Sequence, residues 1–180
     1  MEVIMHNRFV ETLVAGTPHP SLGKHAQTYA RVIGSWIGTL DNHMLGGKPQ
    51  SGSVEAHFAW ALEGRAVQDV WITPARHDRG GKPSSGFDWY GSTLRVFDPS
   101  SEAWTTVWTD PVSQLRIELV GRSQGADIVQ IGTRAGRPIR WTFFDIEQDS
   151  FSWQGHVLNF DGKTWDLEVN IRFRRMKSET

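Results

Sequence analysis

From position 34 onward, hydrophobic and polar residues alternate along the chain in short segments. In the last segment, apolar side chains from Trp165 to Phe173 occupy every second position, and charged or amide side chains lie between them. A period of two is typical of strands that bury one face. The pattern predicts ten strands over Ser35–Asn42, Ser53–Leu62, Arg65–Thr73, Tyr90–Phe97, Ala103–Thr109, Leu115–Val120, Ile128–Gly132, Ile139–Ile146, Phe151–Asn159 and Thr164–Arg174.

Most of the segments between these strands are short and rich in turn-forming residues. Glu63-Gly64, Pro99-Ser100 and Asp161-Gly162 are dipeptides that favour tight turns. The widest interruptions, Met44–Gly52 and Pro74–Asp88, are rich in Gly, Pro, Ser and Lys and indicate loops. A meander of ten strands with one apolar face must close to bury that face. We therefore predict an all-β fold with a single antiparallel barrel.

The residues before the barrel follow a helical period instead. Met5, Phe9 and Leu13 are four residues apart, which places them on one helical face. A second short helix is expected over 22–33, with Ser21 as its N-terminal cap. Its apolar face would consist of Leu22, Ala26, Tyr29 and Ile33. The chain then divides into a helical arm over 1–33, a barrel over 34–176 and a tail over 177–180.

Composition excludes several classes of protein. The 180 residues include no cysteine, so neither a disulfide framework nor thiolate chemistry is available. The formal net charge is −1 and the pI is about 6.7, which gives no global field for nucleic acid. The first 16 residues lack the apolar region of a secretory signal, and no apolar run has the length of a membrane helix. We expect a cytoplasmic protein that binds neither nucleic acid nor membranes, and a homodimer is left open.

Residues at both ends of the barrel carry a family likeness. The first strand begins Gly34-Ser35-Trp36, and the last strand ends in the Arg-rich segment 170–175. This arrangement resembles the lipocalin-like plan of the calycin superfamily, in which a Gly-x-Trp motif is covered by an arginine from the last strand. The resemblance implies that Trp36 plugs one end of the barrel and that Arg172 or Arg174 stacks on its ring.

Further segments extend this likeness across residues 33–175. They are Trp60–Arg65, Arg140–Phe143, Asp149–Trp153 and Asp161–Trp165. In this order they resemble uncharacterised bacterial lipocalin-like proteins. The resemblance implies a calycin-like barrel of about ten strands with a short N-terminal helical segment, and it implies no particular activity.

The nine tryptophans make the lumen the leading candidate site. An exposed belt of large aromatic rings would promote aggregation, so we expect the apolar strand faces to point inward. The residues expected to contact a small hydrophobic or aromatic molecule there are Trp60, Gln68, Tyr90, Trp104, Thr106, Trp108, Gln130, Trp141, Phe143 and Trp153. Barrels of this size are either hollow or filled by side chains, and the sequence leaves both open.

Two alternatives follow from the same barrel. If the polar faces pointed inward, His57 or His156 with Glu55 or Glu168 would supply acid–base groups for a cofactor-independent cyclase or isomerase. A completely filled barrel would instead be an oligomeric or partner-binding module. Haem is not expected because the last strand has no histidine, and no histidine pair has the helical spacing of a metal site.

Overall fold

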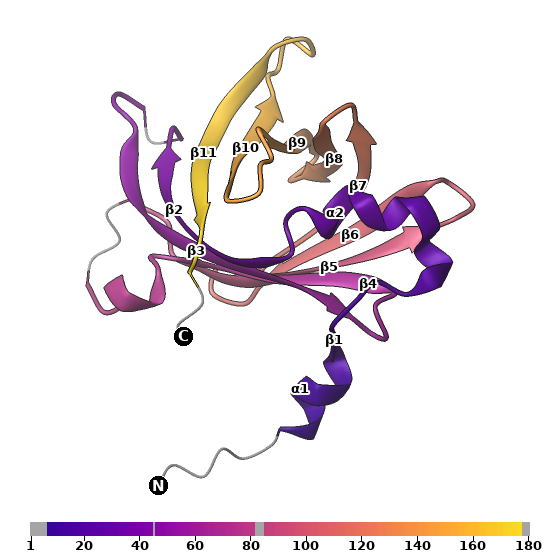
Figure 1. Ribbon diagram of the computed structural model, residues 1–180. Helices are drawn as coiled ribbons and strands as arrows, with labels where there is room; N and C mark the ends of the chain where they lie inside the picture. The colour runs from indigo at the N-terminus through magenta and orange to yellow at the C-terminus, as the bar shows by residue number, and fades with distance from the viewer. Residues whose placement is uncertain (1–6, 45, 82–84, 178–180) are drawn as a thin grey trace, which may run out of the picture.

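The computed structural model describes residues 7–44, 46–81 and 85–177, in which ten antiparallel strands form a closed barrel. Strands β2 to β11 each pair with the next, and β11 pairs back with β2 to close the ring (Figure 1). The strands are β2 (Gly34–Asn42), β3 (Gln50–Ala61), β4 (Ala66–Thr73), β5 (Trp89–Asp98), β6 (Ala103–Asp110), β7 (Leu115–Gln124), β8 (Asp127–Arg134), β9 (Arg137–Phe144), β10 (Ser150–Leu158) and β11 (Trp165–Arg175).

The predicted all-β barrel of ten strands is confirmed, and one small strand was not predicted. The two-residue strand β1 (Val14–Ala15) pairs with Ala61 and Trp60 at the end of β3. On that edge the pairing of β2 ends at Phe58, so β1 continues the sheet beyond it. Closure and β1 together leave little of the sheet edge unpaired.

The N-terminal helices are shorter than the sequence indicated. Helix α1 (Arg8–Leu13) points away from the barrel and buries none of its residues (Figure 1), and Met5 lies outside the described residues. The expected second helix is instead a 3₁₀ segment, η1 (Pro20–Ala26), followed by α2 (Gln27–Ala30). Gly23 breaks the helical path with φ 50° and ψ −132°. The cap is His19, whose Nδ1 accepts a hydrogen bond from the Ser21 amide, so Ser21 is not the cap.

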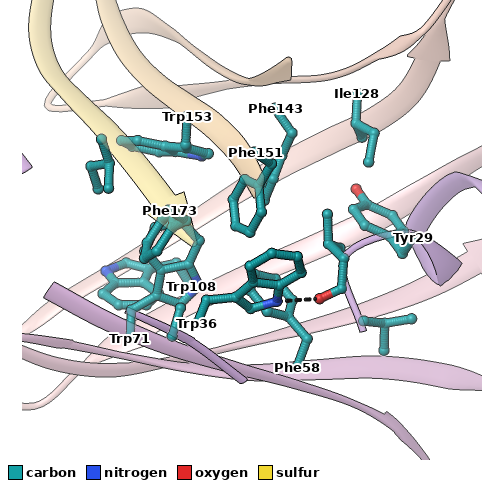
Figure 2. Packing of buried hydrophobic residues seen from close by; sticks show 14 of the residues in the cluster. Tyr29, Trp36, Phe58, Trp71, Trp108, Ile128, Phe143, Phe151, Trp153 and Phe173 are labelled. Atoms are coloured by element: carbon teal, nitrogen blue, oxygen red, sulfur yellow. Dashed lines mark hydrogen bonds between the residues drawn. The ribbon is translucent and has the colours of Figure 1, made fainter. Parts of the chain in front are cut away.

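Aromatic side chains fill the end of the barrel at which β2 begins. The Trp36 indole donates to the Val32 carbonyl at 2.8 Å and meets the Phe151 ring edge to face (Figure 2). Phe151 in turn packs against Phe173 and Phe143 with ring centroids 4.7 and 5.8 Å apart. Edge-to-face and offset contacts of this kind add to the stabilisation from apolar burial. The barrel is therefore plugged at this end.

The cation that covers Trp36 is Arg175, which corrects the expectation of Arg172 or Arg174. Its guanidinium carbon lies 4.0 Å from the centre of the indole ring, and Nη1 donates to the Ile33 carbonyl at 2.9 Å. Gly34 has φ +127°, and a Cβ there would collide with this guanidinium.

Arg172 and Arg174 alternate outward on β11, and Arg172 pairs with Asp41 at 2.9 Å on the outer surface. Arg175 reaches the plug because it pairs with Trp36 and alternates in phase with the inward residues Ile171 and Phe173.

We predict that Arg175→Met lowers the free energy of unfolding by about 1–3 kcal/mol, because it removes a cation–π contact and charged hydrogen bonds to carbonyl groups. Urea denaturation followed by tryptophan fluorescence measures the change. Arg174→Met, at an exposed position on the same strand, is the matched control and is expected to be nearly neutral. Equal losses in the two variants would contradict this account of the plug.

Candidate ligand-binding site

A cavity of about 390 Å³ occupies the part of the lumen away from the plug. Its wall includes Met44 after β2, Ala135 after β8 and Leu115 at the start of β7. In an antiparallel barrel these positions lie at the end opposite to the start of β2. The barrel is therefore packed at one end and hollow at the other.

Six aromatic side chains of the described residues line this cavity, and they form one continuous chain of ring contacts. Trp141 from β9 meets Trp153 and Trp108 edge to face, with ring centroids 5.6 and 6.5 Å apart. Such contacts hold the rings as a fixed wall. In order around the cavity the chain is Phe87, Trp89, Trp108, Trp141, Trp153 and Trp71.

The floor of the cavity holds a buried ion pair between neighbouring strands. Arg95 on β5 lines the cavity, and its Nη1 lies 2.5 Å from Oδ2 of Asp69 on β4. Oδ1 of Asp69 accepts the Thr93 amide at 2.9 Å. The guanidinium also lies over the Tyr29 and Phe58 rings, with its carbon 5.0 and 5.8 Å from their centres. The pair neutralises two charges that would be costly to bury separately.

Gln130 on β8 completes the floor and connects it to the plugged end. Its Nε2 donates to the Tyr29 hydroxyl at 3.1 Å and to the Thr106 hydroxyl at 3.2 Å. Burial raises the pKa of Tyr29, although Arg95 and the hydrogen bonds oppose that effect, so the phenol stays protonated. A Cβ at position 121 would come within 2.7 Å of the Tyr29 hydroxyl, which explains glycine there. The floor is thus a polar layer held by helix α2 and four strands, β4, β5, β6 and β8.

An ion pair spans the mouth of the cavity. Nη2 of Arg134 on β8 lies 2.5 Å from Oε1 of Glu168 on β11, although β9 and β10 lie between these strands.

Glu168 reaches the lumen because β11 bulges. Gly155 pairs with Val169 and His156 pairs with Leu167, which leaves Glu168 as the extra residue. The sequence pattern predicts Glu168 on the outer face, because it assumes that successive side chains of β11 alternate without interruption. The bulge interrupts this alternation and turns Glu168 inward.

The residues predicted to contact a ligand fall into three groups. Trp108, Gln130, Trp141 and Trp153 line the cavity. Four others point inward but lie outside the cavity wall in the packed core, namely Trp60, Trp104, Thr106 and Phe143.

The third group consists of Gln68 and Tyr90. Both lie on the outer face of the barrel, and this placement corrects the expectation that they face the lumen. Trp60 pairs with Val67, so Val67, Asp69 and Trp71 are the inward residues of β4. Tyr90 pairs with Ile72 across the same outer surface. Both strands carry apolar residues on both faces, so the hydrophobic pattern alone indicates the wrong face. Counting residue pairs across the Glu63-Gly64 turn would have given the correct face.

His57 and Glu55 lie together on the outer face of β3, away from the cavity. The Nε2 atom of His57 is 3.5 Å from Glu55 Oε2, and Nδ1 is 2.9 Å from the Ser35 hydroxyl. Arg76 binds Glu55 at 2.6 Å. Burial would raise the pKa of Glu55, but hydrogen bonds and charge from Arg76 outweigh it and hold that pKa below its ordinary value.

His156 also faces outward, on β10. Burial, followed by the charge of Arg140, lowers its pKa, so the ring stays neutral at pH 7. Of the four residues proposed for acid–base chemistry, only Glu168 lines the cavity. Among residues 7–44, 46–81 and 85–177, no group of three or more His, Asp or Glu side chains could hold a metal ion.

The sequence did not identify several cavity residues, among them Arg95, Thr93, Trp71, Trp89 and Phe87. Glu168 was proposed only for the acid–base alternative. The sequence does not indicate that Arg95 is buried, because isolated charges are rarely buried and its partner Asp69 is 26 residues away. The register of β4 against β5 pairs Asp69 with Thr93, which brings Arg95 within reach. This register, rather than any local motif, is the signal that would have revealed the ion pair.

Comparison with solved structures supports the barrel fold. No protein-family model and no curated protein matches this sequence at a significant level. The crystal structure of Rv2717c from M. tuberculosis aligns with a TM-score of 0.59 and 16% identity, covering 89% of this chain and 99% of that one. An S-type phycobiliprotein lyase, CPES from Guillardia theta, aligns with a TM-score of 0.56 and 13% identity over 85% and 93% of the two chains. The chain shares the antiparallel barrel fold of these two structures.

No helix among the described residues is both long and apolar enough to cross a membrane.

The Glu55 cluster predicts a specific pH dependence. Because the pKa of Glu55 is lower in the folded state than in the unfolded chain, its ionised form stabilises the fold above the ordinary glutamate pKa of about 4.3. This contribution is lost as the pH falls through the lower, folded-state value. The free energy of unfolding of the wild type should exceed that of Glu55→Gln at pH 7, and the difference should shrink toward pH 3. A difference independent of pH would contradict the assignment.

Proposed function

We propose that this protein binds a small hydrophobic, aromatic molecule in the hollow end of its barrel. The observation that carries the proposal is the continuous chain of six aromatic rings around a cavity of about 390 Å³. Small-molecule sites are typically concave, mostly apolar and about 300–1,000 Å³ in volume, with a few fixed polar groups. The cavity has all of these properties.

The aromatic wall favours planar ligands. Tryptophan rings held edge to face present both faces and edges to the lumen, and a flat ring system gains from stacking against them. The rings are fixed by their neighbours before a ligand enters, so little conformational freedom is lost on binding. A flexible chain would lose more entropy in the same space.

The loops at the mouth support access for such a ligand. Met44 and Phe87 line the cavity and belong to the two longest connections, after β2 and before β5. The buried side chain of Asn42, the last residue of β2, donates to the Ser85 carbonyl at 2.6 Å, which ties the end of β2 to the connection before β5. Movement of these loops, or opening of the Arg134–Glu168 pair, would widen the entrance.

The binding function fits the placement of titratable groups better than the cyclase or isomerase alternative. His57 and Glu55 share a cluster on the outer face, and His156 lies on another part of that face. Glu168 lines the cavity, but it is paired with Arg134. The acid–base set on which that alternative depends is therefore not assembled in the lumen.

Fluorescence titration with N-phenyl-1-naphthylamine, a neutral aromatic probe that brightens in apolar sites, tests the proposal. We predict saturable binding and energy transfer from tryptophan. Trp141→Ala should weaken this binding about tenfold, since it removes one ring contact worth about 1 kcal/mol or more. Absence of saturable binding to a folded protein would contradict the proposal.

Phe143→Ala is the matched control. Phe143 is buried in the packed end and does not line the cavity. Its truncation should lower the free energy of unfolding by about 3–5 kcal/mol through cavity formation, with little change in probe affinity while the protein remains folded. If Trp141→Ala and Phe143→Ala changed affinity equally, the aromatic chain would not be the binding wall.

A further inference from the structure

Two polar atoms at the floor of the cavity lack a protein partner among the described residues. They are Nε of Arg95 and Oε1 of Gln130. The two residues are 1% and 0% exposed, and both line the cavity. Buried polar groups are nearly always hydrogen-bonded, so an unpaired donor and an unpaired acceptor at one site indicate something that binds both.

The neighbouring atoms of the same two side chains have partners in the protein. Nη1 of Arg95 is held by Asp69, and Nε2 of Gln130 donates to Tyr29 and Thr106. The two buried atoms without a partner are therefore one N–H donor from arginine and one carbonyl acceptor from glutamine. A complementary ligand group therefore presents an oxygen acceptor beside an O–H or N–H donor, as in a carboxamide or a hydroxy ketone.

The charge balance of the site selects a neutral group. Asp69 compensates Arg95, and Glu168 compensates Arg134, so the ionised residues at the cavity sum to zero. A carboxylate head would add an uncompensated negative charge to a largely apolar space, which is unfavourable. A neutral head makes the same two hydrogen bonds without that penalty.

We propose that the ligand is a planar aromatic compound whose inner end carries a neutral acceptor–donor pair, which binds Arg95 and Gln130. This inference rests on the proposed binding function and deepens it, because it names the chemical class and its orientation. The aromatic body lies among the tryptophans, and the polar head points toward the floor.

Three compounds of matched shape test the proposal on the wild-type protein. They are 2-naphthamide, ionised 2-naphthoate and 2-isopropenylnaphthalene, each used to displace N-phenyl-1-naphthylamine at pH 7. We expect the amide to bind at least tenfold more tightly than either of the others. Naphthoate or the hydrocarbon binding as tightly as the amide would overturn this inference while leaving the binding function intact. Failure of the probe itself to bind would overturn both.

Asp69→Asn supplies an independent test. Asn keeps the shape of Asp69 and an oxygen for the Thr93 amide, but it leaves the charge of Arg95 uncompensated. The ratio of naphthoate to naphthamide affinity should rise at least tenfold in this variant. Asp41→Asn is the matched control, since Asp41 pairs with Arg172 on the outer surface, and its ratio should equal that of the wild type. An unchanged ratio in folded Asp69→Asn would overturn the proposal, and if that variant does not fold, the wild-type series decides.

Discussion

The packing of Trp36 across one end of the barrel is the constraint on which the remaining structure depends. The indole fills the lumen where β2 begins, donates to Val32 and supports the rings of Phe151, Phe143 and Phe173. These rings are almost completely buried and in contact with one another, so this end is packed without a ligand. Its stability allows the opposite end to remain hollow without collapse.

The floor between the two ends is built from polar groups that lie far apart in the sequence. Tyr29 from α2, Asp69, Arg95 and Gln130 meet there through hydrogen bonds and an ion pair. Such a network fixes its members in one arrangement, because each buried charge or hydroxyl would be costly without its partner. The floor therefore separates a packed core from a cavity and also presents specific chemistry to that cavity.

The architecture follows closely from the pattern of the sequence, whereas the site follows only in part. A period of two identifies all ten strands, because a strand that buries one face must alternate apolar and polar side chains. It does not identify which face of β4 and β5 is buried. On β5, Leu94 and Val96 make the outer face more apolar than the inner face, which carries Thr93 and Arg95. Likewise, the bulge at Glu168 shifts the alternation of β11, and no local signal marks it. Trp108, Trp141 and Trp153 were identified because β6, β9 and β10 have one clearly more apolar face.

The central claim is that one end of the barrel is packed and the other is hollow and apolar. Crystals of the protein under xenon pressure test this most directly, since xenon occupies dry apolar cavities and not close-packed cores. The account predicts xenon density between Trp108, Trp141 and Trp153 and none among Phe143, Phe151 and Phe173. Density at the phenylalanines, or an aromatic cavity that takes up no xenon, would contradict it.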